Sequence, residues 1–129
     1  MGIFGFIKSS ASEAIAKQKK KQEDAYMDAM TYGESISEVR TAEGAAMYSL
    51  EYALEKFDKC QDKGDMITAM GYLRAIQVSA KLVSNETLKT RYDEALDRRR
   101  YNQLKVLQPI LHNRDLLEKQ GDIYRKTWN

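Results

Sequence analysis

The sequence predicts an all-α fold, an up-and-down bundle of four to five helices. Chain breakers are rare, because the 129 residues include one proline and seven glycines. Strong helix formers such as Ala, Leu, Lys, Glu, Gln and Met are plentiful. Apolar residues recur in steps of three and four along most of the chain, the spacing of one helix face. A chain of this length buries one core, so we expect an apolar segment over residues 1–9 and a single bundle domain over 10–129.

The first helix is expected to begin at Ser10-Ala11-Ser12-Glu13, which has the spacing of a capping box. It should run to Tyr32 and end at Gly33, because glycine readily adopts the left-handed conformation that closes a helix. The middle of this helix, KQKKKQED over residues 17–24, is polar on every side. It must therefore be solvated or packed against another chain.

A second capping signature, Ser35-Ile36-Ser37-Glu38, is expected to open the next helix, and Gly64 should end it. The residues after the signature follow alternating steps of three and four, which predicts a buried seam. A carboxylate interrupts the seam once. Its members are Ile36, Val39, Glu43, Ala46, Leu50, Ala53, Phe57 and Cys60.

Asp65 can cap a third helix over residues 66–83, which is apolar on two sides and is therefore placed in the middle of the bundle. Ser84 or Asn85 should cap a fourth helix, which ends before the polar turn RRRY at 98–101. One side of the third helix holds Met66, Ala69, Met70, Leu73, Ile76, Ala80 and Val83, and the other holds Ile67, Val78 and Leu82. The inner face of the fourth helix holds Leu88, Tyr92, Ala95 and Leu96.

The three-four spacing resumes in the last part of the chain, around Pro109. Either Pro109 begins a fifth helix at its first turn, or it kinks one long helix. We favour a break or kink near Gln108, because proline lacks a backbone donor. The residues on this stripe are Leu107, Ile110, Arg114, Leu117, Gly121, Tyr124 and Trp128.

The sequence carries no signature of an enzyme: it has no glycine-rich phosphate loop, no HExxH motif and no nucleophile with an obvious base. We therefore expect no catalytic residue, cofactor or metal. Cys60 is the only cysteine, which excludes an internal disulfide and a zinc-binding cysteine cluster. A lone thiol suits a reducing compartment, so we expect a cytoplasmic protein. No stretch approaches the ~20 apolar residues of a membrane span.

The two ends of the chain carry the candidate interaction residues, because both combine aromatic and apolar side chains. We expect a non-enzymatic protein–protein interaction module, an inhibitor, adaptor or assembly subunit, that works through helix faces as a homo-oligomer or within a larger complex. The opening IFGFI should form a hydrophobic plug, folded back on the bundle or inserted into a partner chain. The candidates are Ile3, Phe4, Phe6, Ile7, Tyr124 and Trp128.

Two alternatives stay open. The apolar opening and the lysines that follow it could lie on a membrane surface. Two basic clusters could instead contact nucleic-acid phosphates, but the net charge is only +2 and acidic residues border both clusters. Solvated helix faces are therefore the favoured interpretation of the clusters. The basic candidates are Lys19, Lys20, Lys21, Arg98, Arg99 and Arg100.

Glu43 and Arg114 interrupt the apolar stripes of their helices at equivalent positions. We expect them to form a buried or half-buried ion pair that fixes the register of the two helices.

Overall fold

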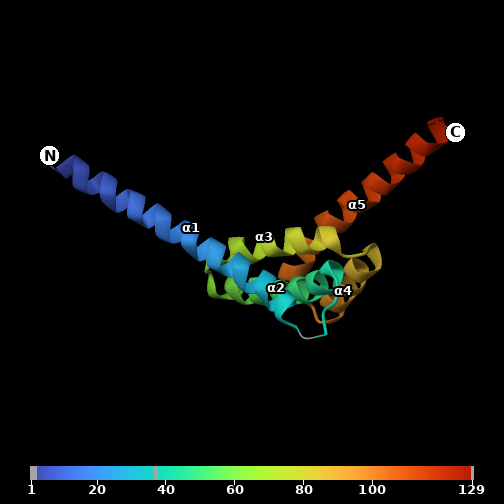
Figure 1. Cartoon of the computed structure of the whole chain (residues 1–129), viewed down its shortest axis with the longest axis horizontal. Helices are drawn as coiled ribbons and strands as arrows, with labels where there is room; N and C mark the ends of the chain where they lie inside the picture. Colours follow the sequence, from blue (N-terminus) through green and yellow to red (C-terminus); the bar gives the residue numbers. More distant parts are fainter. Residues whose placement is uncertain (1–2, 37, 129) are drawn as a thin grey trace.

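The computed structural model describes residues 3–36 and 38–128, and within them the side chains of 11–36 and 38–122. The described chain folds into five helices that pack against one another, so the predicted all-α bundle is confirmed (Figure 1). The helices are α1 (Ile3–Ser35), α2 (Ala42–Lys63), α3 (Met66–Leu82), α4 (Asn85–Asp97) and α5 (Tyr101–Trp128).

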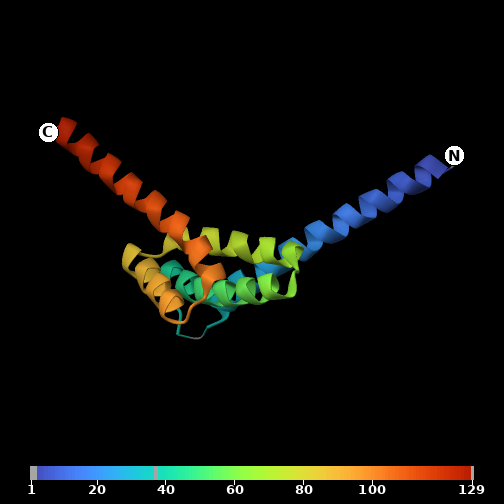
Figure 2. The same ribbon diagram turned by 180° about the vertical axis from the view of Figure 1, so that it is seen from behind.

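Helices α2 and α3 form the central hairpin, closed by the two residues Gly64 and Asp65. The last part of α1 packs against both of them, and α5 packs against α4, α2 and α3. As predicted, α3 therefore lies in the middle of the bundle. Seen from behind, α5 crosses the face opposite α1 (Figure 2).

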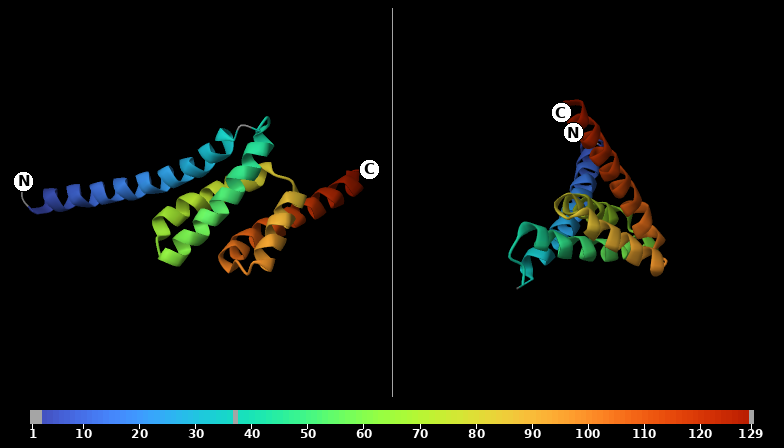
Figure 3. Two further views of the ribbon diagram at one scale, coloured as in Figure 1. Left: turned by 90° about the horizontal axis from the view of Figure 1, so that it is seen from below. Right: turned by 90° about the vertical axis from the view of Figure 1, so that its right-hand side faces the viewer.

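The lengths of the helices determine the shape of the molecule. Helix α1 has 33 residues, whereas its neighbours α2 and α3 have 22 and 17. At a rise of about 1.5 Å per residue, α1 is about 50 Å long and cannot be covered from end to end. Both α1 and α5 leave the bundle as projecting rods, in opposite directions along its long axis (Figure 3, left). Seen from the side, both rods rise from the same side of the bundle (Figure 3, right).

The buried side chains are small on α1 and larger on the other helices. Helix α1 buries Ala25 and Ala29, while the largest fully buried apolar side chains come from the other four helices. These are Leu50, Ile76, Leu88 and Leu107. On α2 the seam residues Ala46, Leu50, Ala53 and Phe57 are buried as predicted. On α3 and just after it, Ala69, Ile76, Ala80 and Val83 are buried as predicted, whereas Met66, Met70 and Leu82 are exposed. Tyr72, Ala75 and Ser79 also face the core.

Two close helix crossings explain why glycine occurs within helices here. A Cβ on Gly33 would lie 2.2 Å from the carbonyl oxygen of Ala45, and a Cβ on Gly71 would lie 2.2 Å from that of Gln22. Gly33 therefore lets α1 approach α2, and Gly71 lets α3 approach α1. The prediction that Gly33 ends the first helix was wrong, because α1 continues to Ser35.

The caps of the central helices largely match the sequence. Asp65 and Ser84 accept hydrogen bonds from the backbone N–H of Thr68 and Thr87, and Gly64 closes α2 at φ 75°. The cap of α2 was mispredicted: Thr41, not Ser35, accepts from the N–H of Gly44. Ser37, part of the predicted signature, lies outside the described residues.

The two terminal helices differ most from the prediction. Helix α1 begins at Ile3 rather than Ser10 and runs unbroken through residues 9 and 10. Its first turns point away from the bundle, so the opening is not a plug folded back on its own chain. Helix α5 runs from Tyr101 through Pro109, so of the two predicted alternatives the single long helix is found, and no new helix begins at the proline. Pro109 and Lys105 are both exposed, so water can reach the carbonyl that the proline leaves without a donor.

Candidate functional site

The first candidate surface is the α1 arm, which we define as residues 3–20 of α1. Every side chain from 11 to 20 is exposed. Lys21 and Gln22 mark the place where α1 meets the bundle: the Nζ atom of Lys21 lies 3.4 Å from a carboxylate oxygen of Asp65. The side-chain amide of Gln22 points at the sulfur of Met70, 3.8 Å away. The arm is about 27 Å of helix, and its described side chains, those of residues 11–20, are not covered by the rest of the chain.

One apolar stripe continues from the covered part of α1 into this arm. In the bundle the stripe is Gln22, Ala25 and Ala29, which are half-buried or buried. In the arm the same spacing of three and four residues passes through Gln18, Ile15 and Ala11, and Ile15 is 54% exposed. The arm thus presents the face that the bundle covers further along the same helix.

The second candidate surface is the α5 arm, residues 115–128 of α5. Within the bundle the α5 stripe consists of Gln103 and Leu107, which are buried, and Ile110, which is half-buried. In the arm the next stripe positions are Leu117, which is 66% exposed, and Gly121. In both long helices, the face that packs in the bundle therefore continues into the arm, where Ile15 and Leu117 on it are exposed.

Arg114 anchors α5 at the point where the arm begins. Its guanidinium donates to Asn85 Oδ1 at 2.9 Å and to the carbonyl oxygen of Ala80, which ties α5 to the end of α3 and the start of α4. The side-chain amide of Asn85 in turn donates to Glu118. Arg114 thus satisfies carbonyl and amide acceptors and does not pair with Glu43.

The predicted core pair of Glu43 and Arg114 was therefore wrong. Glu43 is exposed in the first turn of α2, where a carboxylate is favoured by the positive end of the helix dipole. A three-four stripe shows which face of a helix a residue lies on. It does not show where the helix begins. Here Ile36 and Val39 of the predicted stripe come before α2, which begins at Ala42.

A buried carboxylate, Asp58, occurs where the sequence did not indicate one. Asp58 of α2 is only 5% exposed and accepts from Asn102 Nδ2 at 2.8 Å. It also accepts from Gln103 Nε2 and from Arg100 Nη1, each at 3.5 Å. Asp58 thus holds the α4–α5 turn and the start of α5 against α2. The sequence signal that could have indicated its burial was its position directly after Phe57, a residue of the predicted buried seam.

The basic clusters divide into anchored and exposed members. Arg100 pairs with Asp58 and Lys21 pairs with Asp65, so each cluster gives one cation to an internal ion pair. Arg99 adopts a left-handed backbone conformation, φ 56°, in the turn between α4 and α5. The remaining members are exposed and lie in two separate places: Lys19 and Lys20 on α1, and Arg98 and Arg99 in the turn between α4 and α5.

A tyrosine cluster joins α1, α2 and α3. Asp28 accepts from the hydroxyl of Tyr52 at 2.8 Å and from that of Tyr72 at 2.6 Å. The Tyr32 and Tyr52 rings stack with centroids 4.3 Å apart. Burial and the hydrogen bond to Asp28 raise the pKa of Tyr52 to about 12, and the same causes raise the pKa of Tyr72. Both phenols therefore stay protonated donors at neutral pH, which suits structural anchors and not bases.

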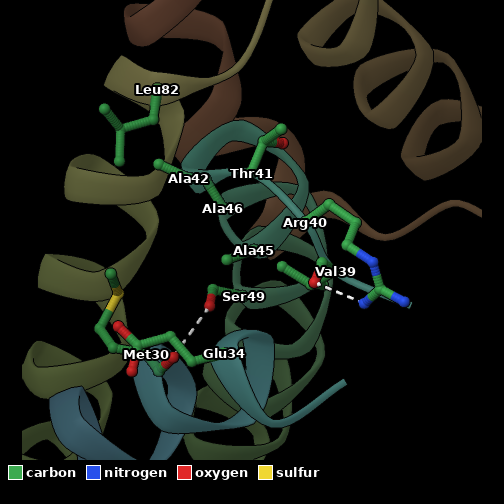
Figure 4. A pocket seen from close by; sticks show the side chains of 10 residues that line it. All are labelled: Met30, Glu34, Val39, Arg40, Thr41, Ala42, Ala45, Ala46, Ser49 and Leu82. Atoms are coloured by element: carbon green, nitrogen blue, oxygen red, sulfur yellow. Dashed lines mark hydrogen bonds between the residues drawn. The ribbon is translucent and has the colours of Figure 1, made fainter. Parts of the chain in front are cut away.

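A hollow of about 350 Å³ lies between the end of α1, the loop after it, the start of α2 and the end of α3 (Figure 4). Its walls are mainly short or apolar side chains. Ser49 Oγ donates to the Met30 carbonyl at 3.5 Å, and the Arg40 guanidinium points away from the hollow. Its lining includes Met30, Val39, Ala42, Ala45, Ala46 and Leu82. This lining suits an apolar contact more than acid–base chemistry.

The candidates at the two ends are only partly described. The backbones of residues 3–7 and 124–128 are helical and form the outer turns of the two arms. The side chains of Ile3, Phe4, Phe6, Ile7, Tyr124 and Trp128 lie outside the described residues. Among the described residues, no group of His, Cys, Asp and Glu side chains could hold a metal ion. No described helix has the length and apolar character needed to cross a membrane.

No protein-family model matches the chain, and comparison with curated proteins and with solved structures gives no match either.

Proposed function

We propose that this protein is a non-enzymatic interaction module, an adaptor or assembly subunit that binds other protein through the stripes on its two arms. The observation that carries the proposal is the continuity of the stripes. Ala29 and Leu107 are buried in the bundle, and Ile15 and Leu117 lie further out on the same helix faces and are exposed. A face with this pattern is what one helix offers to another.

The energetics of isolated helices support the same function. Helices of fewer than about 12–15 residues are marginal in water, and most helices in proteins depend on packing of an apolar face. The described residues of the two arms, 11–20 and 115–122, are all exposed except Gly121, which is half-buried. A partner helix that covers the stripe would supply the missing packing and exclude water from Ile15 or Leu117.

The chain offers matched substitutions to test this. Ile15→Glu and Leu117→Glu place a charge on the stripes, whereas Ala16→Glu and Leu116→Glu place one on the neighbouring faces of the same arms. All four positions are exposed, so none of these changes should unfold the bundle. Cross-linking in cells, followed by identification of the cross-linked proteins, copies of this chain included, is the measurement.

We expect the stripe variants to lose cross-links that the control variants keep. If all four variants and the unaltered protein give the same cross-links, the arms are not binding surfaces and the proposal is wrong.

A membrane surface is the second candidate, favoured by the position of the opening residues at the far end of the α1 arm. An apolar segment followed by lysines can enter the headgroup region of an anionic bilayer. The full chain and an Ile7→Glu variant should then differ in flotation with anionic vesicles. Equal flotation of the two proteins would contradict this alternative.

A further inference from the structure

We propose that a hollow beside the tyrosine cluster binds an alkylated ammonium group, that of a free amine such as choline or of a methylated lysine side chain. The hollow has a volume of about 380 Å³ and lies where the end of α1 meets the middle of α2. Three aromatic rings and two carboxylates line it. They are Tyr32, Tyr48, Glu51, Tyr52 and Glu55. The site is separate from the two arms, so it goes beyond the proposed function.

The four lining residues of α2 lie on one face of that helix. At about 100° per residue, they fall within an arc of about 100°, with Glu51 at one edge and Tyr52 at the other. Tyr32 of α1 stacks on the Tyr52 ring, with centroids 4.3 Å apart, and extends the aromatic edge. The rings and the carboxylates therefore border the same hollow and do not point to different sides of the helix.

The rings retain surface for a ligand. Stacking on Tyr52 covers one face of the Tyr32 ring, yet Tyr32 is still 40% exposed. Tyr48 is half-buried and lines the same hollow. The face of an aromatic ring carries partial negative charge and attracts a cation that lies within about 6 Å of its centre. Tyr52 already makes such a contact, because the ammonium of Lys56 lies 5.4 Å from its ring centroid.

The carboxylates give the hollow a negative charge. The side chain of Glu51 is 61% exposed. Glu55 accepts from Gln103 Nε2 at 3.5 Å, and this amide carries no charge. A third carboxylate, Asp28, accepts from the Tyr52 hydroxyl at 2.8 Å and so lies beside the stacked rings. A cation in the hollow would therefore be attracted by the rings and by nearby acids together.

The chain's own cations lie at the edges of this face. Lys56 projects from α2 about 40° beyond Tyr52, on the side away from Glu51, and does not line the hollow. At the opposite edge, Arg91 Nη1 lies 3.5 Å from Glu51 Oε1 and 3.2 Å from a carboxylate oxygen of Glu94. Arg91 is thus shared between two acids, and the hollow between the edges stays open. The other arginines near Glu51 border a separate hollow and are Arg98 and Arg100.

The size and lining of the hollow select the ligand. Its volume lies at the lower end of the ~300–1,000 Å³ typical of small-molecule sites. A metal ion needs closely gathered ligand atoms, and no His, Cys, Asp and Glu group among the described residues could hold one. An alkylated ammonium is larger, places apolar methyl groups against the rings and keeps its charge for the carboxylates. A few such contacts predict a dissociation constant of about 1–10 mM.

The test is a titration of the full chain with choline chloride to about 50 mM, followed by NMR of the tyrosine rings. The matched ligand is the neutral alcohol in which a carbon atom replaces the charged nitrogen of choline. Sodium chloride controls for ionic strength. We expect choline to shift the ring signals of Tyr32 and Tyr48, and the neutral alcohol to bind at least about ten-fold more weakly.

Variants of the lining locate the binding. Tyr32→Leu removes a ring face and should weaken choline binding about five-fold or more, whereas Tyr32→Phe keeps the ring and should bind within about two-fold of the wild type. Glu55→Gln removes a charge at almost constant shape and should weaken binding about two- to five-fold at low salt. Tyr101→Leu, at an exposed tyrosine of α5, is the control and should bind choline like the wild type. Circular dichroism should show equal helix content in all five proteins.

The proposal is wrong if choline shifts no tyrosine signal or if the neutral alcohol binds as tightly as choline. It is equally wrong if either Tyr32→Leu or Glu55→Gln binds choline like the wild type. Where choline binds as expected, a capped tripeptide of glycine, trimethyllysine and glycine identifies the source of the ammonium. Tighter binding of the tripeptide indicates a methylated lysine of another protein, and tighter binding of choline indicates a free amine. The cross-links of the arm variants test the proposed function separately.

Discussion

One stripe of helix α1 lies partly inside the bundle and partly on the arm. In the bundle the stripe residues are small, Ala25, Ala29 and Gly33, and the neighbouring helices cover them. In the arm the stripe includes Ile15, larger and more than half exposed. Helix α5 repeats the comparison with identical side chains: Leu107 is fully buried and Leu117, ten positions later on the same stripe, is 66% exposed. The spacing of apolar residues therefore defines a face, and the lengths of the neighbouring helices decide how much of that face is covered.

The two leucines of α5 give the largest expected difference. Leu107→Ala removes a fully buried side chain from the core, and we expect a loss of about 2–5 kcal/mol in the free energy of unfolding. Leu117→Ala should change it by less than about 0.5 kcal/mol in dilute solution, because the side chain is already in water. Urea denaturation followed by circular dichroism measures both. Equal losses for the two variants would mean that the α5 arm is covered within the monomer.

The glycine at the α1–α3 crossing gives the next largest difference. Gly71→Ala places a Cβ 2.2 Å from the Gln22 carbonyl oxygen and 2.7 Å from the Ala25 Cβ, both part of closely packed helices. We expect a loss of about 1–3 kcal/mol and faster hydrogen exchange of the amides of α1 from 22 to 35. Ala14→Val, which also adds bulk to a small residue but in the arm, should change the free energy of unfolding by less than about 0.5 kcal/mol. A Gly71→Ala protein as stable as the wild type would contradict the close crossing.

Much of the bundle follows from the sequence because its signals are local. Gly64, Asp65 and Ser84 act within one turn of their own positions, and the α2 seam of Ala46 and Leu50 is a property of one helix. The features that the sequence did not reveal depend on a neighbour. A glycine such as Gly33 is typical of a helix end, and only the nearby Ala45 backbone shows that it instead lets α1 approach α2 closely.

The same reason explains the candidate sites. Sequence spacing placed Glu43 and Arg114 on their stripes but could not show that α2 begins at Ala42 or that Arg114 reaches Ala80. Asp28 and Asp58 were missed because their partners come from other helices. The candidate residues at the two ends of the chain lie in helical turns, and for residues 3–7 this was not predicted, because the first helix was expected to begin at Ser10. Their role as binding residues stays a prediction.

The tyrosine cluster gives a smaller effect, visible at alkaline pH. The pKa of Tyr52 is raised from 10.0 to about 12 in the folded state. Between these values the folded protein keeps a proton that the unfolded chain loses, so this contribution to stability is fully present below pH 10 and is lost as pH rises through 12. Tyr52→Phe should lower stability by about 1 kcal/mol at about pH 8, because a hydrogen bond to Asp28 is lost, and should flatten the decline above about pH 10.

Urea denaturation at steps from about pH 8 to about pH 12 would show both effects. Tyr101→Phe, which alters a phenol at an exposed position on α5, is the matched control and should retain the wild-type decline. A Tyr52→Phe protein whose stability declines as steeply as the wild type's would show that the cluster does not hold the proton.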